Sequence, residues 1–309
     1  MLPKDMLNLH DFTRDDLEEI LQRATYFKKK DGELFSSLQG KNIAVSFWEP
    51  STRTRLSFEL AVHKLGGRVV NLNPGISSEG KGENMEDTIK TLASLGASAL
   101  IFRHRSPGFF QRISQSMEMP LISGGEGCYQ HPTQALLDIF TLHEKGVNLA
   151  ETTVVMIGDI LHSRVARSHF YALPLFGASL TLVAPPVLLP PELISSGIGW
   201  SYHLEEALPA GDVVYLLRVQ KERQEKGLLP SLGEYAALYG LNEKRLALLK
   251  ENAFLMHPGP VNIGIEISSR ALKKLESIHP QRVLFQEQVQ NGVYVRMAVL
   301  DLLVAGRVV

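Results

Sequence analysis

Three hydroxyl groups and two guanidinium groups are closely spaced in Ser51, Thr52, Arg53, Thr54 and Arg55. They lie between an apolar run typical of a buried strand and a stretch with helical periodicity, so a helix should begin among them. Backbone N–H groups and the helix dipole make such a position favourable for an anion. Arginine forks can bind phosphate oxygens bidentately. The segment therefore predicts a phosphate site; the alternative is ordinary helix capping beside two surface arginines.

Polar or cationic residues also follow other apolar runs. They are Arg103-His104, Gly158-Asp159, Arg218 and His257. In open parallel sheets, ligands bind beyond the carboxyl ends of the strands, where the strand order reverses. These residues are therefore candidates for a binding site, although strands can also simply end in polar residues. No Gly-x-x-x-x-Gly-Lys-Ser/Thr loop is present, so ATP binding is not indicated.

Short apolar runs alternate with helix-period stretches, which is typical of parallel α/β units. Thr13 and Asp16 resemble a capping box, and Gly66-Gly67 should end a second helix. The helical stretch 133–143 is expected to join two α/β domains, and 293–303 is also helical in pattern. The predicted buried strands are 43–47, 99–102, 120–122, 154–157, 180–183, 213–217 and 254–256.

The bulk composition excludes several classes of protein. The 309 residues suffice for two domains, and the net charge of -1 argues against a general nucleic-acid binder. The single cysteine, Cys128, cannot form an intrachain disulfide, and no Cys/His spacing for zinc occurs. We find neither a secretory h-region nor 18 consecutive apolar residues, so we expect a cytoplasmic location and no membrane partner.

Two longer segments identify a family. Phe47-Trp48-Glu49-Pro50-Ser51-Thr52-Arg53-Thr54-Arg55-Leu56-Ser57-Phe58-Glu59 resembles the carbamoyl-phosphate signature of the aspartate and ornithine carbamoyltransferases. His131-Pro132-Thr133-Gln134-Ala135-Leu136-Leu137-Asp138 resembles the second signature of the family, and further segments match in the same order over nearly the whole chain. The resemblance implies two doubly wound parallel-sheet α/β domains joined by interdomain helices. The carbamoyl-phosphate-binding domain would comprise 1–134 plus a C-terminal helix at about 290–309, and the aspartate-binding domain 135–289.

The resemblance implies a role for each residue at the donor site. An amine attacks the carbamoyl carbon and phosphate leaves, so negative charge builds on the carbonyl oxygen and on the phosphate and needs fixed donors. Gln134 would orient the carbamoyl NH2 group. The implied phosphate ligands are Ser51, Thr52, Arg53 and Thr54, and the implied carbonyl-oxygen ligands are Thr54, Arg103 and His131.

The acceptor implied by the resemblance is aspartate. Arg164 would bind its α-carboxylate, and Arg218 with Gln220 would bind the dicarboxylate, a pocket that would repel cationic ornithine. The backbone carbonyls of Gly259 and Pro260 would receive the carbamoyl NH2 or the substrate amine. Taken alone, 218–223 could be a charged helix face and 257–260 a plain turn.

The Gly- and Ser-rich loop 73–83 matches a family loop that reaches into the active site of a neighbouring subunit. The resemblance assigns Ser77 and Lys81 to the active site of the neighbouring subunit and implies a homotrimer. Lys81 would touch both the phosphate and an aspartate carboxylate. The alternative is a surface loop with a solvated lysine. The sequence leaves open whether regulatory chains or dihydroorotase also bind.

Some features depart from the family pattern. Ser123 and Glu126 stand in a Ser-Gly-Gly-Glu-Gly segment where the family often has Asn-Ala-Gly-Asp-Gly, a change that could alter packing beside His131. Ile263 replaces a common arginine. No metal or organic cofactor is required, and no protein general base is evident. The rival interpretations are a transcarbamoylase for another amine acceptor, a non-catalytic scaffold, and a phosphate or carboxylate binding module without turnover.

Overall fold

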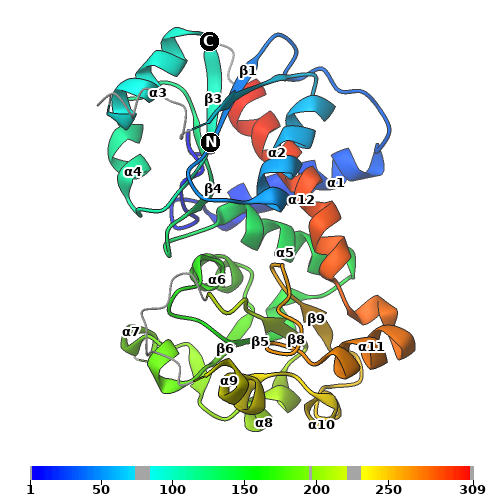
Figure 1. Ribbon diagram of the computed structural model, residues 1–309. Helices are drawn as coiled ribbons and strands as arrows, with labels where there is room; N and C mark the ends of the chain where they lie inside the picture. Colours follow the sequence, from blue (N-terminus) through cyan, green and yellow to red (C-terminus); the bar gives the residue numbers. More distant parts are fainter. Residues whose placement is uncertain (1, 74–83, 195–196, 221–230, 307–309) are drawn as a thin grey trace. The chain divides into compact units, whose positions relative to one another are not determined.

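The computed structural model describes residues 2–73, 84–194, 197–220 and 231–306. The chain divides into two compact units, the first made of Met1–Phe140 with Val289–Val309 and the second of Thr141–Gln288. Helices α5 (Pro132–Glu144) and α12 (Phe285–Leu300) each begin in one unit and end in the other (Figure 1).

The first unit contains a sheet of four parallel strands in the order β2-β1-β3-β4. The chain leaves β1 for β2 on one side and then returns to form β3 on the other side. The strand order therefore reverses between β1 and β3, where a ligand is expected at the carboxyl ends. Register pairs Phe47, the last residue of β1, with Arg103 of β3. The strands are β1 (Asn42–Phe47), β2 (Arg68–Leu72), β3 (Ala97–His104) and β4 (Leu121–Glu126).

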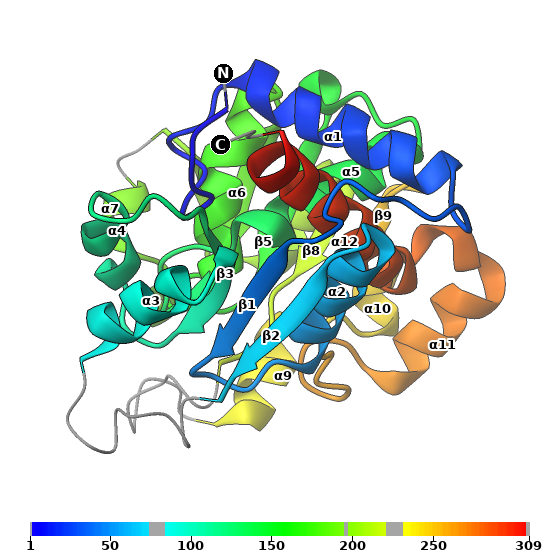
Figure 2. The ribbon, with the colours of Figure 1, turned by 90° about the horizontal axis from the view of Figure 1, so that it is seen from above.

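Helices cover both faces of this sheet. Figure 2 shows α3 and α4 on one side of β1 and β3, with α1, α2 and α12 on the other. The predicted capping box of α1 is confirmed, because Thr13 and Asp16 each accept from the other's backbone N–H. Gly66 follows α2 with a φ of 79°, a conformation that favours glycine. The helices are α1 (Arg14–Lys29), α2 (Thr52–Lys64), α3 (Met85–Ser94) and α4 (Phe109–Ser114), and a π-helical turn covers Asp301–Ala305.

The second unit contains five parallel strands in the order β7-β6-β5-β8-β9. Here the order reverses between β5 and β8, whose last residues Ile157 and Leu216 are register partners. The strands are β5 (Thr153–Ile157), β6 (Ser179–Val183), β7 (Gly199–Ser201), β8 (Val213–Leu216) and β9 (Phe254–Met256).

Figure 1 shows α6 on one side of the second sheet and α8 and α9 on the other. A buried apolar cluster that includes Val155, Val214 and Leu255 joins the strands to Tyr235 of α9. Among the described residues, no helix combines the length and apolar character needed to cross a membrane. The helices are α6 (Arg164–Leu175), α7 (Pro191–Ile194), α8 (Leu204–Ala207), α9 (Leu232–Tyr239), α10 (Glu243–Leu246) and α11 (Ser269–Ile278).

The fold class predicted from the sequence, two parallel-sheet α/β domains, is confirmed, and all seven predicted strands are present. Two strands, β2 and β7, were not predicted, and both lie at a sheet edge. The predicted helix 133–143 is α5, whereas the helix expected at 293–303 begins earlier, at Phe285.

Candidate active site

The N-terminus of α2 lies directly after β1, as the sequence predicted. Ser51 is the N-cap residue, yet its side chain makes no capping hydrogen bond. Its Oγ instead accepts from Nη1 of Arg103 at 3.1 Å. Ordinary capping by Ser51 is therefore not what the structure shows, and the hydroxyl belongs to a polar cluster.

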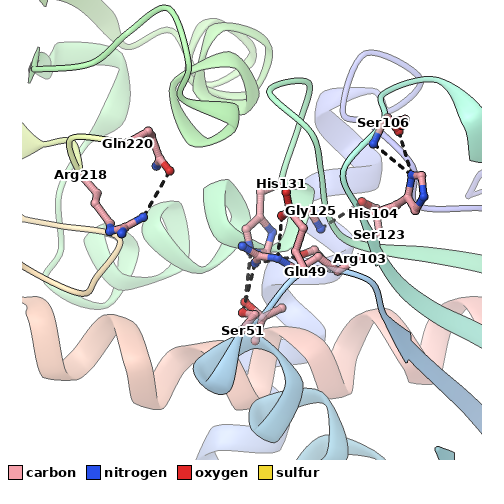
Figure 3. A network of polar contacts seen from close by, with 12 residues as sticks. Glu49, Ser51, Arg103, His104, Ser106, Ser123, Gly125, His131, Arg218 and Gln220 are labelled. Atoms are coloured by element: carbon pink, nitrogen blue, oxygen red, sulfur yellow. Dashed lines mark hydrogen bonds and ion pairs between the residues drawn. The ribbon is translucent and has the colours of Figure 1, made fainter. Parts of the chain in front are cut away.

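Arg103 is the centre of this polar cluster (Figure 3). Besides Ser51, its guanidinium donates from Nε to Glu49 Oε2 at 3.3 Å and from Nη1 to the Gly124 carbonyl at 3.4 Å. The Arg103 side chain is only 13% exposed. Three acceptors, two in the loop between β1 and α2 and one in β4, thus hold one cation at the carboxyl edge of the first sheet.

A second contact joins α2 to α5. The hydroxyl Oγ1 of Thr54 lies 3.3 Å from Nε2 of His131, and both side chains are buried. His131 directly precedes Pro132, the first residue of α5, and proline suits the first helical position because its missing N–H needs no partner there. One turn into α5, Gln134 donates from Nε2 to Oδ1 of Asp138 at 3.0 Å.

The two arginines at the start of α2 differ in their surroundings. Arg55 is bound to Glu59 at 2.8 Å and to Asn71 at 3.1 Å. Arg53 is exposed, as is Thr52, and within the described part of the chain no side chain pairs with its guanidinium. Arg53 is therefore the arginine of the pair that can receive an incoming anion.

Ser123 and Glu126, which depart from the family pattern, both lie in β4. Ser123 Oγ accepts from the Gly125 N–H at 3.1 Å, which stabilises the turn next to the Gly124 carbonyl. Glu126 accepts from the Phe110 N–H at 3.4 Å, in the first turn of α4. Burial raises the pKa of Glu126. Glutamate is one methylene longer than the aspartate that the family often has here. Its carboxylate contacts the first turn of α4 and helps to fix the position of that helix.

In the second unit, the candidate residues after β5 and β8 are joined by hydrogen bonds. Fully buried Asp159 accepts from the Gln220 N–H at 3.2 Å, and its other oxygen lies 2.8 Å from His162 Nδ1. Arg218 donates from Nη1 to Oε1 of Gln220 at 3.3 Å (Figure 3). Arg164, the first residue of α6, is 5% exposed. Both strands of the switch point in this sheet thus end in cationic or hydrogen-bonding residues.

Glu266 connects the Arg218 segment with the loop that follows β9. Its Oε1 accepts from the Val219 N–H at 2.8 Å, and its Oε2 lies 2.9 Å from His257 Nε2. Asn262 donates to both oxygens at 2.6 Å. The Nδ1 of His257 accepts from the Gly259 N–H at 2.7 Å, next to the cis bond between Gly259 and Pro260. One buried carboxylate therefore fixes two loops that carry candidate residues.

The Glu266 carboxylate should make stability depend on pH. Burial is the largest single influence and acts to raise its pKa, but the hydrogen bonds from His257, Val219 and Asn262 together outweigh burial, and the pKa lies below its usual range. Glu266→Gln should lower the free energy of unfolding by about 2 kcal/mol at neutral pH. A carboxyl group with a lowered folded pKa stabilises above its unfolded pKa, and this contribution is lost as pH falls through the folded pKa.

Thermal melts at a series of pH values test this expectation. The melting temperatures of the wild type and of Glu266→Gln should converge as the solution is acidified. Glu276→Gln is a matched control, because Glu276 is exposed on α11. A difference in melting temperature between the wild type and Glu266→Gln that stays constant from neutral to acidic pH would show that the carboxylate charge is not what stabilises these loops.

Ser77 and Lys81 lie outside the described residues. Sequence reasoning gave no role to Glu49, Asp138 or Glu266, which hold candidate residues in place. The only feature of the sequence that could have indicated these three residues is that each is acidic and lies inside or near a segment that resembles the family. In the ranges that the structure describes, no group of three or more His, Cys, Asp or Glu side chains could hold a metal ion.

Two parallel sheets, each with basic and hydrogen-bonding side chains at its switch point, define an α/β protein built to bind anionic ligands. Residues 4–144 match the family model of the aspartate/ornithine carbamoyltransferase carbamoyl-P binding domain, and 150–303 match that of the Asp/Orn binding domain. The chain belongs to the aspartate/ornithine carbamoyltransferase family.

Individual relatives agree with this family. The aspartate carbamoyltransferase catalytic subunit of Desulforudis audaxviator is 45% identical over 308 residues, which cover 99% of each chain. Aspartate transcarbamoylase from Trypanosoma cruzi, solved in complex with carbamoyl phosphate and aspartate, is 30% identical with a TM-score of 0.84, covering 96% of this chain and 95% of that chain. Ornithine carbamoyltransferase from Thermus thermophilus is 25% identical with a TM-score of 0.85, covering 98% and 100%.

Proposed function

We propose that this protein transfers the carbamoyl group of carbamoyl phosphate to the α-amino group of L-aspartate, giving N-carbamoyl-L-aspartate and phosphate. The observation that carries the proposal is the Arg103 cluster at the switch point of the first sheet, next to a helix N-terminus with exposed Arg53. The identity of 45% to a named aspartate carbamoyltransferase catalytic subunit supports the same reaction. The product is a precursor in pyrimidine biosynthesis, and we place the reaction in the cytoplasm.

In this proposal the donor binds to the first unit. The helix N-terminus with Ser51, Thr52, Arg53 and Thr54 holds the phosphate, since aligned N–H groups and a guanidinium suit a dianion. The carbonyl oxygen receives donors from Thr54, Arg103 and His131. The contacts of Arg103 with Glu49 and Ser51 fix it before the substrate arrives, so little reorganisation is needed as charge develops.

The acceptor binds to the second unit. Arg164 binds the α-carboxylate of aspartate, and Arg218 with Gln220 binds the remaining carboxylate. A cationic ornithine side chain would be repelled by these arginines, which favours aspartate over ornithine. The carbonyls of Gly259 and Pro260 accept from the carbamoyl NH2 or from the attacking amine.

The reaction then proceeds without a cofactor. The lone pair of the neutral amine forms a bond to the carbamoyl carbon, and the bond from that carbon to the phosphate oxygen breaks. The departing phosphate takes the amine proton, which accounts for the absence of an assigned protein base.

Product analysis tests the reaction directly. The purified protein with carbamoyl phosphate and L-aspartate should release inorganic phosphate and N-carbamoyl-L-aspartate in equal amounts. Replacing aspartate with ornithine should abolish product formation. Phosphate release without a carbamoylated product, or product from ornithine alone, would contradict the proposal.

We further propose that the active protein is a homotrimer in which Ser77 and Lys81 enter the site of the adjacent subunit. Subunit exchange between Lys81→Ala and Arg53→Ala trimers should then restore activity, because some mixed sites contain both native residues. A mixture of Arg53→Ala and Arg103→Ala is the matched control, since both residues belong to the same subunit's part of the site and no mixed site is intact. Equal activity in the two mixtures after verified exchange would contradict the shared site.

A further inference from the structure

His257 directly follows β9 and is a buried side chain to which the proposed reaction gives no role. The backbone N–H of Gly259 donates to its Nδ1 at 2.7 Å, and its Nε2 lies 2.9 Å from Oε2 of Glu266. A backbone N–H can only donate, so Nδ1 must carry a lone pair and the ring proton must be on Nε2, where it faces the carboxylate. The neutral Nε2–H tautomer is therefore the state of the ring that satisfies both contacts.

The surroundings of His257 hold this ring in place. Its backbone N–H donates to Oε1 of Gln288 at 3.0 Å, and its ring is inclined by 65° to that of Phe285, with the ring centroids 5.8 Å apart. Its other partner, the Glu266 carboxylate, also accepts from the Val219 N–H at 2.8 Å. The imidazole thus connects a carboxylate that is itself fixed with the backbone of the loop after β9.

The segment after His257 offers a single backbone donor. Proline has no backbone N–H, so in Pro258-Gly259-Pro260 only Gly259 can donate, and it donates to the imidazole. The φ of Gly259 is 66°, a conformation that favours glycine. Within the described part of the chain, no backbone N–H donates to the carbonyls of Gly259 and Pro260. These carbonyls can therefore accept from a ligand, and the imidazole fixes the residue that carries the first of them.

We infer that His257 is a positioning residue: in its neutral Nε2–H form it fixes the Gly259 N–H and so orients the carbonyls of Gly259 and Pro260 toward the substrate N–H groups that they accept. The inference rests on the proposed function in one respect, the role of these two carbonyls. Acceptors that are oriented before the reactants meet need little reorganisation during the reaction, so the contribution should appear in kcat.

Two substitutions separate the roles of the two ring nitrogens. In His257→Asn, Oδ1 takes the place of Nδ1 and can still accept from the Gly259 N–H. In His257→Gln, the amide NH2 takes the place of Nε2 and can donate to Glu266, but no acceptor faces Gly259. Both variants lose the imidazole ring and its contact with Phe285. His257→Gln should lower kcat by about five- to tenfold, the effect of one hydrogen bond, whereas His257→Asn should keep at least about half of the wild-type kcat.

Initial rates with each substrate varied in turn give kcat and both KM values. The KM for aspartate should change little in either variant, because Arg164 and Arg218 bind the carboxylates in the proposed function. A merely structural role would lower the melting temperature of both variants and leave no difference in kcat between them. His143→Asn and His143→Gln are the matched controls, since His143 is exposed in the last turn of α5, and both should leave kcat unchanged.

Failure of this inference is distinguishable from failure of the proposed function. Folded His257→Gln with wild-type kcat, or an equal loss of kcat in His257→Gln and His257→Asn, would overturn the inference. If either variant does not fold, neutron diffraction of the wild type decides: the deuteron should lie on Nε2 of His257, and a deuteron on Nδ1 would contradict the inference. A wild-type protein that forms no N-carbamoyl-L-aspartate would reject the reaction itself.

Discussion

Replacing Arg103 with alanine should lower kcat by about 10²–10³, the usual cost of removing one donor that stabilises a developing oxyanion. The physical reason is that three acceptors, Glu49, Ser51 and the Gly124 carbonyl, hold the guanidinium in place before substrate binds. Arg103→Lys should rescue little, because a lysine ammonium cannot reproduce the fork that spans these acceptors. Steady-state kinetics with both substrates saturating measure the effect.

Arg14→Ala is the control for loss of an arginine. Arg14 is exposed at the start of α1 and pairs with Glu18 at 2.7 Å. An exposed pair of this kind contributes about 0–1 kcal/mol to stability and should leave kcat unchanged. Arg103→Ala with at least a third of wild-type kcat would remove Arg103 from the proposed chemistry.

The second large effect is expected at the acceptor site. Arg218→Ala should raise the KM for aspartate by about 10- to 100-fold, because a charged hydrogen bond to a carboxylate is lost. The KM for carbamoyl phosphate should change little, since the proposed ligands of its phosphate and carbonyl oxygen belong to the other unit. Initial rates with each substrate varied in turn separate the two constants.

Arg270→Ala provides the comparison, since Arg270 is exposed on α11. It should leave both KM values unchanged. If Arg218→Ala instead raises the KM for carbamoyl phosphate and leaves that for aspartate unaltered, the division of the two substrates between the units is wrong.

Local signals in the sequence predicted much of the fold. The capping box of Thr13 and Asp16 and the glycine after α2 depend on neighbouring residues, and both are present. Long apolar runs marked the central strands because both faces of those strands are buried. Strands β2 and β7 escaped prediction because they are largely exposed and lack such runs, whereas β4 and β9 at the opposite edges are largely buried and were predicted.

Contacts between distant segments could not be predicted in this way. The motif around Ser51 indicated a helix N-terminus, but not that its hydroxyl would accept from Arg103, 52 positions away. Likewise, nothing local to Glu266 shows that it receives the Val219 N–H, 47 positions earlier. Buried carboxylates are revealed only when the segments around them are packed, because the same residues on a surface would look identical in sequence.

The separate switch points of the two sheets have an evolutionary consequence. Under the proposed function, the loops after β5, β8 and β9 bind the amine, and the N-terminus of α2 with the start of α5 binds the carbamoyl donor, so changes in those loops can alter the amine that is accepted while the donor stays the same. A family built on this plan can diversify its products by altering one half of the chain. The structural similarity of this protein to both an aspartate and an ornithine enzyme fits such modular divergence.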